Sequence, residues 1–419
     1  MKIVKRHITP RVLEALRLSP VVFLNGARQS GKSTLTYNIR DEISPGGELA
    51  GYVSLDRPAQ LGAASTAPEA FLKGQPKPLI IDEVQMAPDL FRALKIVVDE
   101  QRIQEGRKAN GQFLLTGSAN VLAFPRLSDA LVGRMSVLTL YPFSTAEATG
   151  GKGNGLDRIL DMQFSHMDDR GIHLKEAIKL ATFPEASGRS FQERTLWFDG
   201  YLNTLLQRDV RMMAELERIA LLPGLLRILA TRAGSLINDS DISRSLGLSS
   251  VTGKFYRNIL KMMFLNFDVR PWFRNMGKRL VKSAKGYLTD TLMLCHLLGV
   301  DIDELLKSRP ELFGHVGENF VATELIKQLS YTTRRADLLH FRTSDGKEVD
   351  FVLEQPDGSI VAIEVRMSEI IRGEDFKGIK TLAALTGEDF RGGVVLYSGK
   401  EVVPFGEDLF AVPVHVLWQ

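Results

Sequence analysis

The sequence predicts an α/β protein whose first part is a parallel sheet covered by helices on both faces. Three short apolar runs, at residues 21–24, 78–82 and 112–116, are separated by helix-compatible stretches that begin near Lys32 and Pro88. Short and nearly continuous apolar strands that alternate with helices are typical of a parallel sheet buried on both faces. We therefore expect the first part of the chain to form one such domain.

Length and composition bound the class of protein. The chain has 419 residues, which is enough for two or three domains. Apolar residues make up 44% and charged residues 25%, and these values exclude a disordered, collagenous or disulfide-scaffold protein. The formal charge is only +3, so total charge indicates no partner and any basic surface must be local.

Cysteine content and hydropathy indicate the compartment. Cys295 is the single cysteine, so it cannot form an internal disulfide, which fits a reducing compartment and excludes a cysteine zinc cluster. No apolar run approaches the ~18 residues that span a bilayer. The N-terminus also lacks the long apolar segment of a signal peptide. We expect a cytoplasmic protein with no membrane partner.

The remaining elements follow from local patterns. An amphipathic helix is predicted near residues 11–18. Residues 157–250 have a helical pattern, with a long segment at 201–216 and a break at Pro223-Gly224 before a further helix. Two strand-like runs, 348–354 and 360–365, flank a Gln-Pro-Asp-Gly turn.

The motif G-x-x-x-x-G-K-[ST] follows the first apolar run and precedes a helix, which is its usual context. The backbone N–H groups of such a loop face anionic oxygens. Its lysine reaches the β- and γ-phosphates, and its serine can ligate Mg²⁺. The sequence therefore predicts ATP and Mg²⁺ as cofactors. The expected nucleotide-binding residues are Gly26, Ala27, Arg28, Gln29, Ser30, Gly31, Lys32, Ser33 and Thr34.

The catalytic candidates lie after the second and third apolar runs. Asp82 can hold Mg²⁺ together with Ser33, and Glu83 can orient and deprotonate an attacking water. Thr116 or Ser118 would lie beside the γ-phosphate or that water, although a plain turn explains either residue equally well.

Arg134 is a candidate arginine finger. An arginine supplied across a subunit boundary can neutralise transition-state charge. This role would make the protein a homo-oligomer. A structural arginine at residue 134 is the alternative.

These motifs resemble the AAA+ branch of P-loop ATPases. The chain is more closely similar to a prokaryotic family that joins such a domain to a C-terminal domain of unknown function. The resemblance spans most of the chain and implies an ATPase with a helical lid. The stretches that carry it are Gly26–Thr34, Ile80–Gln85, Leu114–Asn120, Gly133–Glu147, Phe183–Glu185, Tyr201–Val210 and Gly317–Leu325.

Residues 240–265 have the pattern of a winged helix-turn-helix. Gly247 separates a short helix from a longer one that begins near Ser249, a good N-cap. One face of the longer helix is apolar and is expected to point to the core: Val251, Phe255, Ile259 and Met262. Another face is basic and supplies the expected DNA contacts: Lys254, Arg257 and Lys261.

The segment from Lys254 to Lys285 supports DNA as a partner. It holds nine Lys or Arg residues and one acid, Asp268, with aromatic residues interleaved. Phosphate contact needs such a local cluster. A lid, or a contact with another subunit or protein, is the alternative use of a winged helix in an ATPase of this kind.

The last part of the chain has an acidic pattern similar to that of PD-(D/E)xK nucleases. Glu318 lies on a helix pattern, Asp350 lies on one strand, and Glu364 and Arg366 are two apart on the next strand and share a face. In such a fold the carboxylates hold Mg²⁺, which activates water.

Arg366 stands where the pattern has a lysine. Arginine does not release its proton readily, so it can instead neutralise Asp350 and Glu364 as a salt bridge. An active nuclease, a degenerate nuclease fold and an unrelated small α/β domain all remain open.

Four regions result: an ATPase domain at 1–150, a helical lid or linker at 151–235, a winged helix at 236–290 and a restriction-endonuclease-like α/β domain at 291–419. The predicted function is Mg²⁺-dependent ATP hydrolysis coupled to a C-terminal half that binds duplex DNA or a protein. One alternative is a nucleotide-dependent DNA-binding module, with little turnover and a regulatory or defence role. The other is a nuclease switched by ATP.

Overall fold

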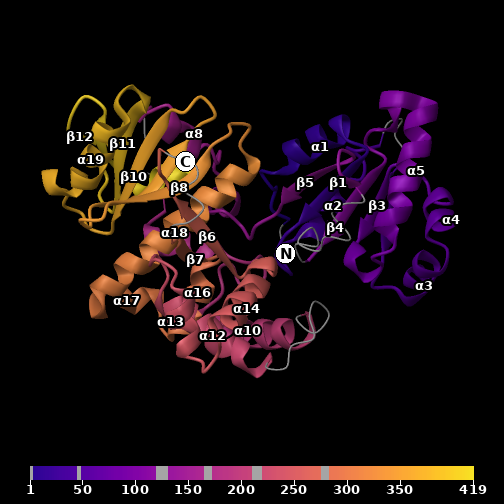
Figure 1. Cartoon of the computed structure of the whole chain (residues 1–419), viewed down its shortest axis with the longest axis horizontal. Coiled ribbons are helices and arrows are strands. Elements are labelled where there is room, and N and C mark those ends of the chain that lie inside the picture. Colours follow the sequence, from indigo (N-terminus) through magenta and orange to yellow (C-terminus); the bar gives the residue numbers. More distant parts are fainter. Residues whose placement is uncertain (1–2, 45–48, 119–130, 165–171, 210–218, 275–282) are drawn as a thin grey trace. The chain divides into compact units, whose positions relative to one another are not determined.

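The computed structural model describes residues 3–44, 49–118, 131–164, 172–209, 219–274 and 283–419. The chain forms two compact units, residues 1–142 with 262–264, and residues 143–261 with 265–419 (Figure 1). Over the described ranges, no helix is long and apolar enough to cross a bilayer.

A five-stranded parallel sheet forms the centre of the first unit. Its strands are β1 (Val21–Asn25), β2 (Gly51–Ser54), β3 (Leu79–Asp82), β4 (Phe113–Gly117) and β5 (Met135–Thr139), in the order β2-β3-β4-β1-β5. Every residue of β1, β3 and β4 is buried, which explains why these strands are continuous apolar runs. The predicted parallel α/β architecture is confirmed for this unit.

Helices pack on this sheet. They are α1 (Thr9–Leu18), α2 (Lys32–Asn38), α3 (Pro58–Thr66), α4 (Pro68–Lys73) and α5 (Leu90–Glu105). Phe91 and Leu94 of α5 share one core with Phe23, Ile81 and Leu115 of the sheet. This core fixes the carboxyl ends of β1, β3 and β4 beside one another, and the predicted phosphate-binding and acidic residues follow those ends.

The second unit begins with helices. In chain order they are α7 (Thr145–Thr149), α8 (Gly155–Leu160), α9 (Leu174–Leu180), α10 (Phe191–Thr204), α12 (Leu222–Thr231), α13 (Asp239–Arg244), α14 (Ser250–Met262), α16 (Thr291–Leu298), α17 (Ile302–Ser308), α18 (Pro310–Tyr331) and α19 (Lys377–Thr386). The predicted helix at 201–216 is observed to Asp209, and the rest lies outside the described residues. The predicted break at Pro223 is instead the first turn of α12, where proline is tolerated.

An eight-stranded mixed sheet completes the second unit, in the order β12-β13-β11-β10-β9-β8-β6-β7. Its strands are β6 (Asn266–Pro271), β7 (Lys285–Leu288), β8 (Asp337–Arg342), β9 (Glu348–Glu354), β10 (Ile360–Arg366), β11 (Phe390–Tyr397), β12 (Val403–Pro404) and β13 (Leu409–Pro413). Strands β9 and β10 are the two predicted from the Gln-Pro-Asp-Gly turn, and they pair antiparallel. Beside β10, β11 runs parallel, and α19 packs on this part of the sheet.

The predicted inner face of α14 is wrong in its first two turns. Val251 is 81% exposed and Phe255 is 50% exposed, whereas Tyr256 and Leu260 are buried. The reason lies at Gly253, where an added Cβ would be 1.9 Å from Ser243 Oγ of α13. This close approach turns the Gly253 side of α14 toward α13 and the Val251 side toward solvent.

Candidate functional site

The predicted phosphate loop connects β1 to α2 and depends on glycine. Gly26 has φ +147°, and a Cβ there would lie 2.1 Å from the Leu140 carbonyl oxygen. Gly31 has φ +96°, and Gln29 also has positive φ. Positive φ is disfavoured for residues with side chains, so the two glycines set the path of the loop.

Two cations hold the loop from inside the unit. The buried Lys32 ammonium donates to the carbonyl oxygens of Gly26 at 2.9 Å and Ala27 at 2.8 Å. The buried Arg6 guanidinium donates to the Ser30 carbonyl at 2.7 Å and to the Tyr141 carbonyl at 2.6 Å. The sequence motif predicts Lys32 as part of the loop. Arg6 was not predicted, because it lies outside the motif and nothing in its neighbouring sequence indicates a contact with the loop.

The predicted metal ligands Ser33 and Asp82 lie together. Ser33 Oγ donates to Asp82 Oδ1 at 3.0 Å, and Tyr52 Oη donates to Asp82 Oδ2 at 2.9 Å. Thr116 Oγ1 of β4 also donates to Asp82 Oδ1. Burial, followed by the Asp82 charge, raises the pKa of Tyr52 above its ordinary value. The sheet therefore brings a hydroxyl and a carboxylate oxygen, the oxygen ligands that Mg²⁺ accepts, to one point.

Glu83 is held next to this point. Its backbone is left-handed, at φ 57°, and its N–H donates to Thr116 Oγ1 at 3.1 Å. Its carboxylate accepts a hydrogen bond from Gln85 Nε2, which also donates to Ser118 Oγ at 3.0 Å. Thr116 thus contacts Asp82 and Glu83, and Ser118 contacts Gln85. Gln85 is a residue of the site that the sequence analysis did not predict. Thr34, in the first turn of α2, is exposed.

Arg134 has a partner within its own unit. Its Nε donates to Asp99 Oδ1 at 2.6 Å and its Nη2 to Asp99 Oδ2 at 2.9 Å. This bidentate pair raises the pKa of Arg134, mainly through its hydrogen bond to Asp99. The pair with Asp99 favours the alternative interpretation, in which Arg134 has a structural role. To act as an arginine finger, Arg134 would first have to leave Asp99.

The acids predicted for the second unit also come together. Lys285 Nζ of β7 donates to Glu318 Oε1 of α18 at 3.1 Å and to Asp350 Oδ1 of β9 at 2.9 Å. Tyr287 Oη donates to the same Glu318 oxygen at 2.7 Å. We call Lys285, Glu318, Asp350, Glu364 and Arg366 the β7–β10 ion cluster.

The expected partners of Arg366 need one correction. Arg366 Nη2 lies 2.6 Å from Glu364 Oε1, and its Nε lies 3.1 Å from Asp375 Oδ1. Asp350 takes Lys285 instead, because Lys285 enters from β7 and is only 3% exposed at its side chain. Lys285 was expected in a solvent-facing basic segment, so this burial is also a correction.

Burial dominates the electrostatics of the β7–β10 ion cluster. It raises the pKa of Glu318 to about 7, with the Asp350 charge adding to the effect. It also raises the pKa of Glu364 well above its ordinary range, with Asp350 again the second cause. The pKa of Lys285 is raised despite burial, because Asp350 and Glu318 lie beside its ammonium.

The polar residues of the stretch Gly317–Leu325 and of the next turn of α18 hold backbone groups. Glu324 accepts from the Thr145 N–H at 3.1 Å, and Lys327 donates to the Phe143 and Ala181 carbonyls at 2.9 and 3.1 Å. Asn319 and Gln328 make similar contacts with β7, with Leu156 and with Leu417. These hydrogen bonds give the buried polar residues of this stretch, other than Glu318, a structural role.

The predicted basic face of α14 is wrong at Arg257. Its side chain is 7% exposed, and its guanidinium bonds Asp239 at 2.8 Å and Asp268 at 3.0 Å. Lys261 also pairs with Asp268, at 2.9 Å, and keeps 46% of its side chain exposed. Lys254 is exposed. Two of the three predicted DNA contacts therefore remain accessible, and Lys278, Arg279 and Lys282 of the basic segment lie outside the described residues.

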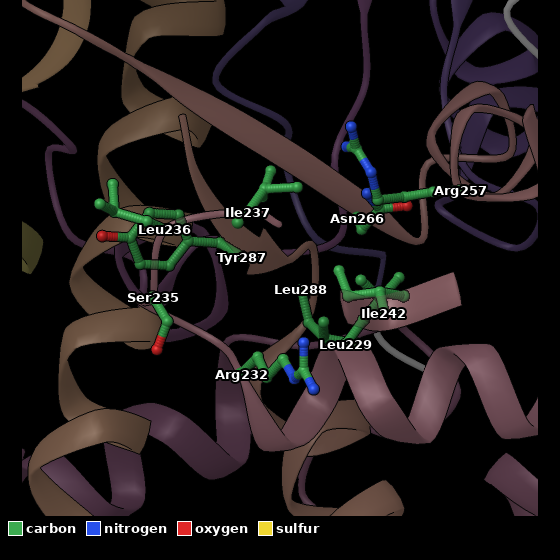
Figure 2. Close-up of a pocket in the computed structure, with 11 residues that line it drawn as sticks. Leu229, Arg232, Ser235, Leu236, Ile237, Ile242, Arg257, Asn266, Tyr287 and Leu288 are labelled. Carbon is green, nitrogen blue, oxygen red and sulfur yellow. The ribbon is translucent and has the colours of Figure 1, made fainter. Parts of the chain in front are cut away.

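One small cavity lies among α12, α13, α14 and β7. Figure 2 shows Leu229, Ile242, Asn266 and Leu288 around it, and its volume is about 20 Å³. A cavity of ~10–15 Å³ holds one water molecule. This cavity is therefore too small for a substrate, and the phosphate loop remains the candidate functional site.

Three family models match the chain. Residues 18–149 match an AAA domain, residues 172–304 match a domain of unknown function (DUF8612), and residues 313–417 match a second domain of unknown function (DUF4143). The AAA match contains the whole phosphate loop and the two acids at the carboxyl end of β3, Asp82 and Glu83. The chain therefore carries an ATP-binding domain of the AAA type.

Three similar proteins are described as uncharacterized. Those of Mycobacterium tuberculosis and Mycobacterium bovis are each 30% identical over 355 residues, covering 84% of this chain and 72% of the relative. One from Haemophilus influenzae is 22% identical over 349 residues, covering 80% of this chain and 79% of the relative. The crystal structure of CDC6P from Pyrobaculum aerophilum is 13% identical and covers 73% of this chain and 96% of that one, at a TM-score of 0.26. A similarity that weak carries no conclusion.

Proposed function

This chain belongs to the family of the two mycobacterial proteins, and we propose that it is a Mg²⁺-dependent ATPase that binds nucleotide at its phosphate loop. The observation that carries the proposal is the meeting of Asp82, Glu83 and Thr116, at the ends of β3 and β4, with Ser33 in the first turn of α2. A structural loop would need the glycines. It would not need two acids and two hydroxyls converging beside a buried lysine.

Each residue then has a role in the reaction. Lys32 leaves the carbonyl oxygens of the loop and bonds the β- and γ-phosphates. Ser33 and Asp82 would hold Mg²⁺, which would neutralise phosphate charge. Glu83 orients the attacking water and accepts its proton.

Two residues position Glu83. Thr116 joins Asp82 to the Glu83 N–H, so it fixes the backbone from which the carboxylate projects. Gln85 bonds the carboxylate itself and connects it to Ser118. These contacts restrict the movement of the carboxylate, which favours proton transfer from a positioned water.

Nucleotide binding by the full chain tests the proposal. Lys32→Ala should abolish binding of a fluorescent ATP analogue in the presence of Mg²⁺. Lys73→Ala is the matched control, because Lys73 lies in the same unit and forms an exposed pair with Glu100. Equal binding by Lys32→Ala and the control would refute the assignment of the site.

Duplex DNA is the second candidate function. Helices α12, α13 and α14 are followed by β6 and β7, and Leu236 forms a bridge with Lys285, so the order of elements is similar to that of a winged helix. Lys254 is exposed on α14, and Lys261 is half exposed. These two lysines, without Arg257, are the contacts that we propose.

A salt-dependent gel shift tests this function. Lys254→Glu with Lys261→Glu should weaken binding to duplex DNA and flatten its dependence on salt. Lys347→Glu, on the exposed turn before β9, is the control. An unchanged shift in the double variant would remove α14 as the DNA-binding surface. A homo-oligomer stays a prediction tied to the finger role of Arg134.

A further inference from the structure

The β7–β10 ion cluster contains the three acids of a nuclease-like metal site, but a lysine lies between two of them. Lys285 Nζ is 2.9 Å from Asp350 Oδ1 and 3.1 Å from Glu318 Oε1. Its side chain is 3% exposed and that of Asp350 is 6% exposed. The ammonium is therefore enclosed together with the carboxylates that it bonds.

The residues present do not fit a divalent cation. Mg²⁺ sits ~2.1 Å from its oxygen ligands, so a metal shared by Asp350 and Glu318 would need the space that Lys285 Nζ fills. Within the described ranges, no three acidic, histidine or cysteine side chains form a group that could hold a metal.

The other carboxylate oxygens of Asp350 and Glu364 are also engaged. Asp350 Oδ2 accepts the Val365 N–H at 3.0 Å, and Glu364 Oε2 accepts the Asp350 N–H at 3.3 Å. Glu364 Oε1 lies 2.6 Å from Arg366. A metal would have to displace both cations and at least one backbone hydrogen bond.

We propose that Lys285 takes the position of the metal ion, so that the second unit carries a metal-independent ion cluster rather than a nuclease centre. Lys285 and Arg366 supply the positive charge that the three acids need. Lys285 is the more important of the two, because it is the only described cation that bonds both Glu318 and Asp350.

This cluster also joins two matched domains. Lys285 lies within the match to DUF8612, and the acids lie within the match to DUF4143. The backbone of β7 pairs with β6, while the Lys285 side chain reaches α18 and β9. The ion cluster thus fastens β7 to the C-terminal domain.

Mn²⁺ binding by the full chain, without nucleotide, tests the proposal. Electron paramagnetic resonance measures free Mn²⁺ in titrations of four proteins: the wild type, Asp350→Asn, Lys285→Ala and the double variant. The first two should bind equal amounts of Mn²⁺, since the lysine excludes the metal. Lys285→Ala should bind one more ion per chain, because it leaves acids without a cation, and the double variant should lose this ion.

Two results would overturn the proposal. One is a wild type that binds one more Mn²⁺ than Asp350→Asn. The same conclusion would follow if the wild type nicked a supercoiled plasmid in the presence of Mn²⁺ and Asp350→Asn did not. Such activity would make Lys285 part of an active nuclease. The other is a Lys285→Ala protein that gains no Mn²⁺ although its second unit is folded, as shown by a cooperative urea transition of its three tryptophans. Where Lys285→Ala does not fold, the comparison of wild type with Asp350→Asn still separates a metal-independent cluster from a nuclease centre.

Discussion

Replacing Arg257 should destabilise the second unit, although sequence alone placed this residue on a solvent-facing basic surface. The side chain is 7% exposed and contacts two acids, Asp239 at 2.8 Å and Asp268 at 3.0 Å. Removing one partner of a buried ion pair costs about 3–5 kcal/mol, because a charge is left without compensation. Asp268 keeps Lys261, and Asp239 is 21% exposed, so we expect the lower end, about 3 kcal/mol.

Urea unfolding followed by tryptophan fluorescence measures this cost. All three tryptophans, Trp197, Trp272 and Trp418, belong to the second unit, so the signal reports that unit alone. Arg257→Met should lower its unfolding free energy by about 3 kcal/mol, and Lys254→Met, an exposed neighbour, by under about 0.5 kcal/mol. Equal and small effects would show that Arg257 is not buried as described, and would return it to the candidate DNA surface.

Three further predictions concern single side chains. Gly26→Ala should abolish ATP binding, measured by calorimetry, because its Cβ would lie 2.1 Å from the Leu140 carbonyl oxygen; normal affinity would contradict the loop geometry. Thr116→Val should lower kcat for ATP hydrolysis about 10- to 100-fold, since hydrogen bonds to charged groups contribute about 1.5–3 kcal/mol, and an unchanged kcat would argue against the contact with Asp82. Burial lowers the pKa of His340 to about 4, so the folded state resists protonation and stability is lost as pH falls from about 6.5 to 4. At 1.36 kcal/mol per pKa unit, the unfolding free energy of the wild type relative to His340→Asn should fall by about 3 kcal/mol over that range, whereas a pH-independent difference would contradict the burial of His340.

The parts of the fold that sequence predicted are those with local signals. Strands β1, β3 and β4 are apolar runs because both of their faces are buried, and β9 and β10 flank a turn whose residues specify it. The phosphate loop needs glycine at two positions, so its spacing is visible in the chain.

Contacts between distant residues had no such signal. Lys285 was the last cation of a basic segment, and its partners Glu318 and Asp350 lie 33 and 65 residues further along the chain. Arg134 and Asp99 are 35 residues apart. Charge patterning along the chain cannot separate a solvated lysine from one whose acid arrives on another strand.

Helical periodicity could not identify the buried face of α14. Two overlapping apolar stripes fit its sequence, one through Val251 and Phe255 and another through Tyr256 and Leu260. Gly253 selects the second stripe, because α13 approaches at that point. Gly253 weakened the prediction of a helix from the sequence, because glycine is unfavourable inside helices. In the fold, the contact of Gly253 with α13 orients α14.

ATP turnover by Glu83→Gln tests the central claim most directly. Glutamine keeps the shape of Glu83 but cannot accept the proton of the attacking water, so the variant should bind ATP and Mg²⁺ as the wild type does. Its hydrolysis rate in single-turnover experiments should fall about 100-fold or more, as expected when a positioned base is lost. A Glu83→Gln protein that hydrolyses ATP at the wild-type rate would contradict the account, as would a wild-type protein that binds no ATP.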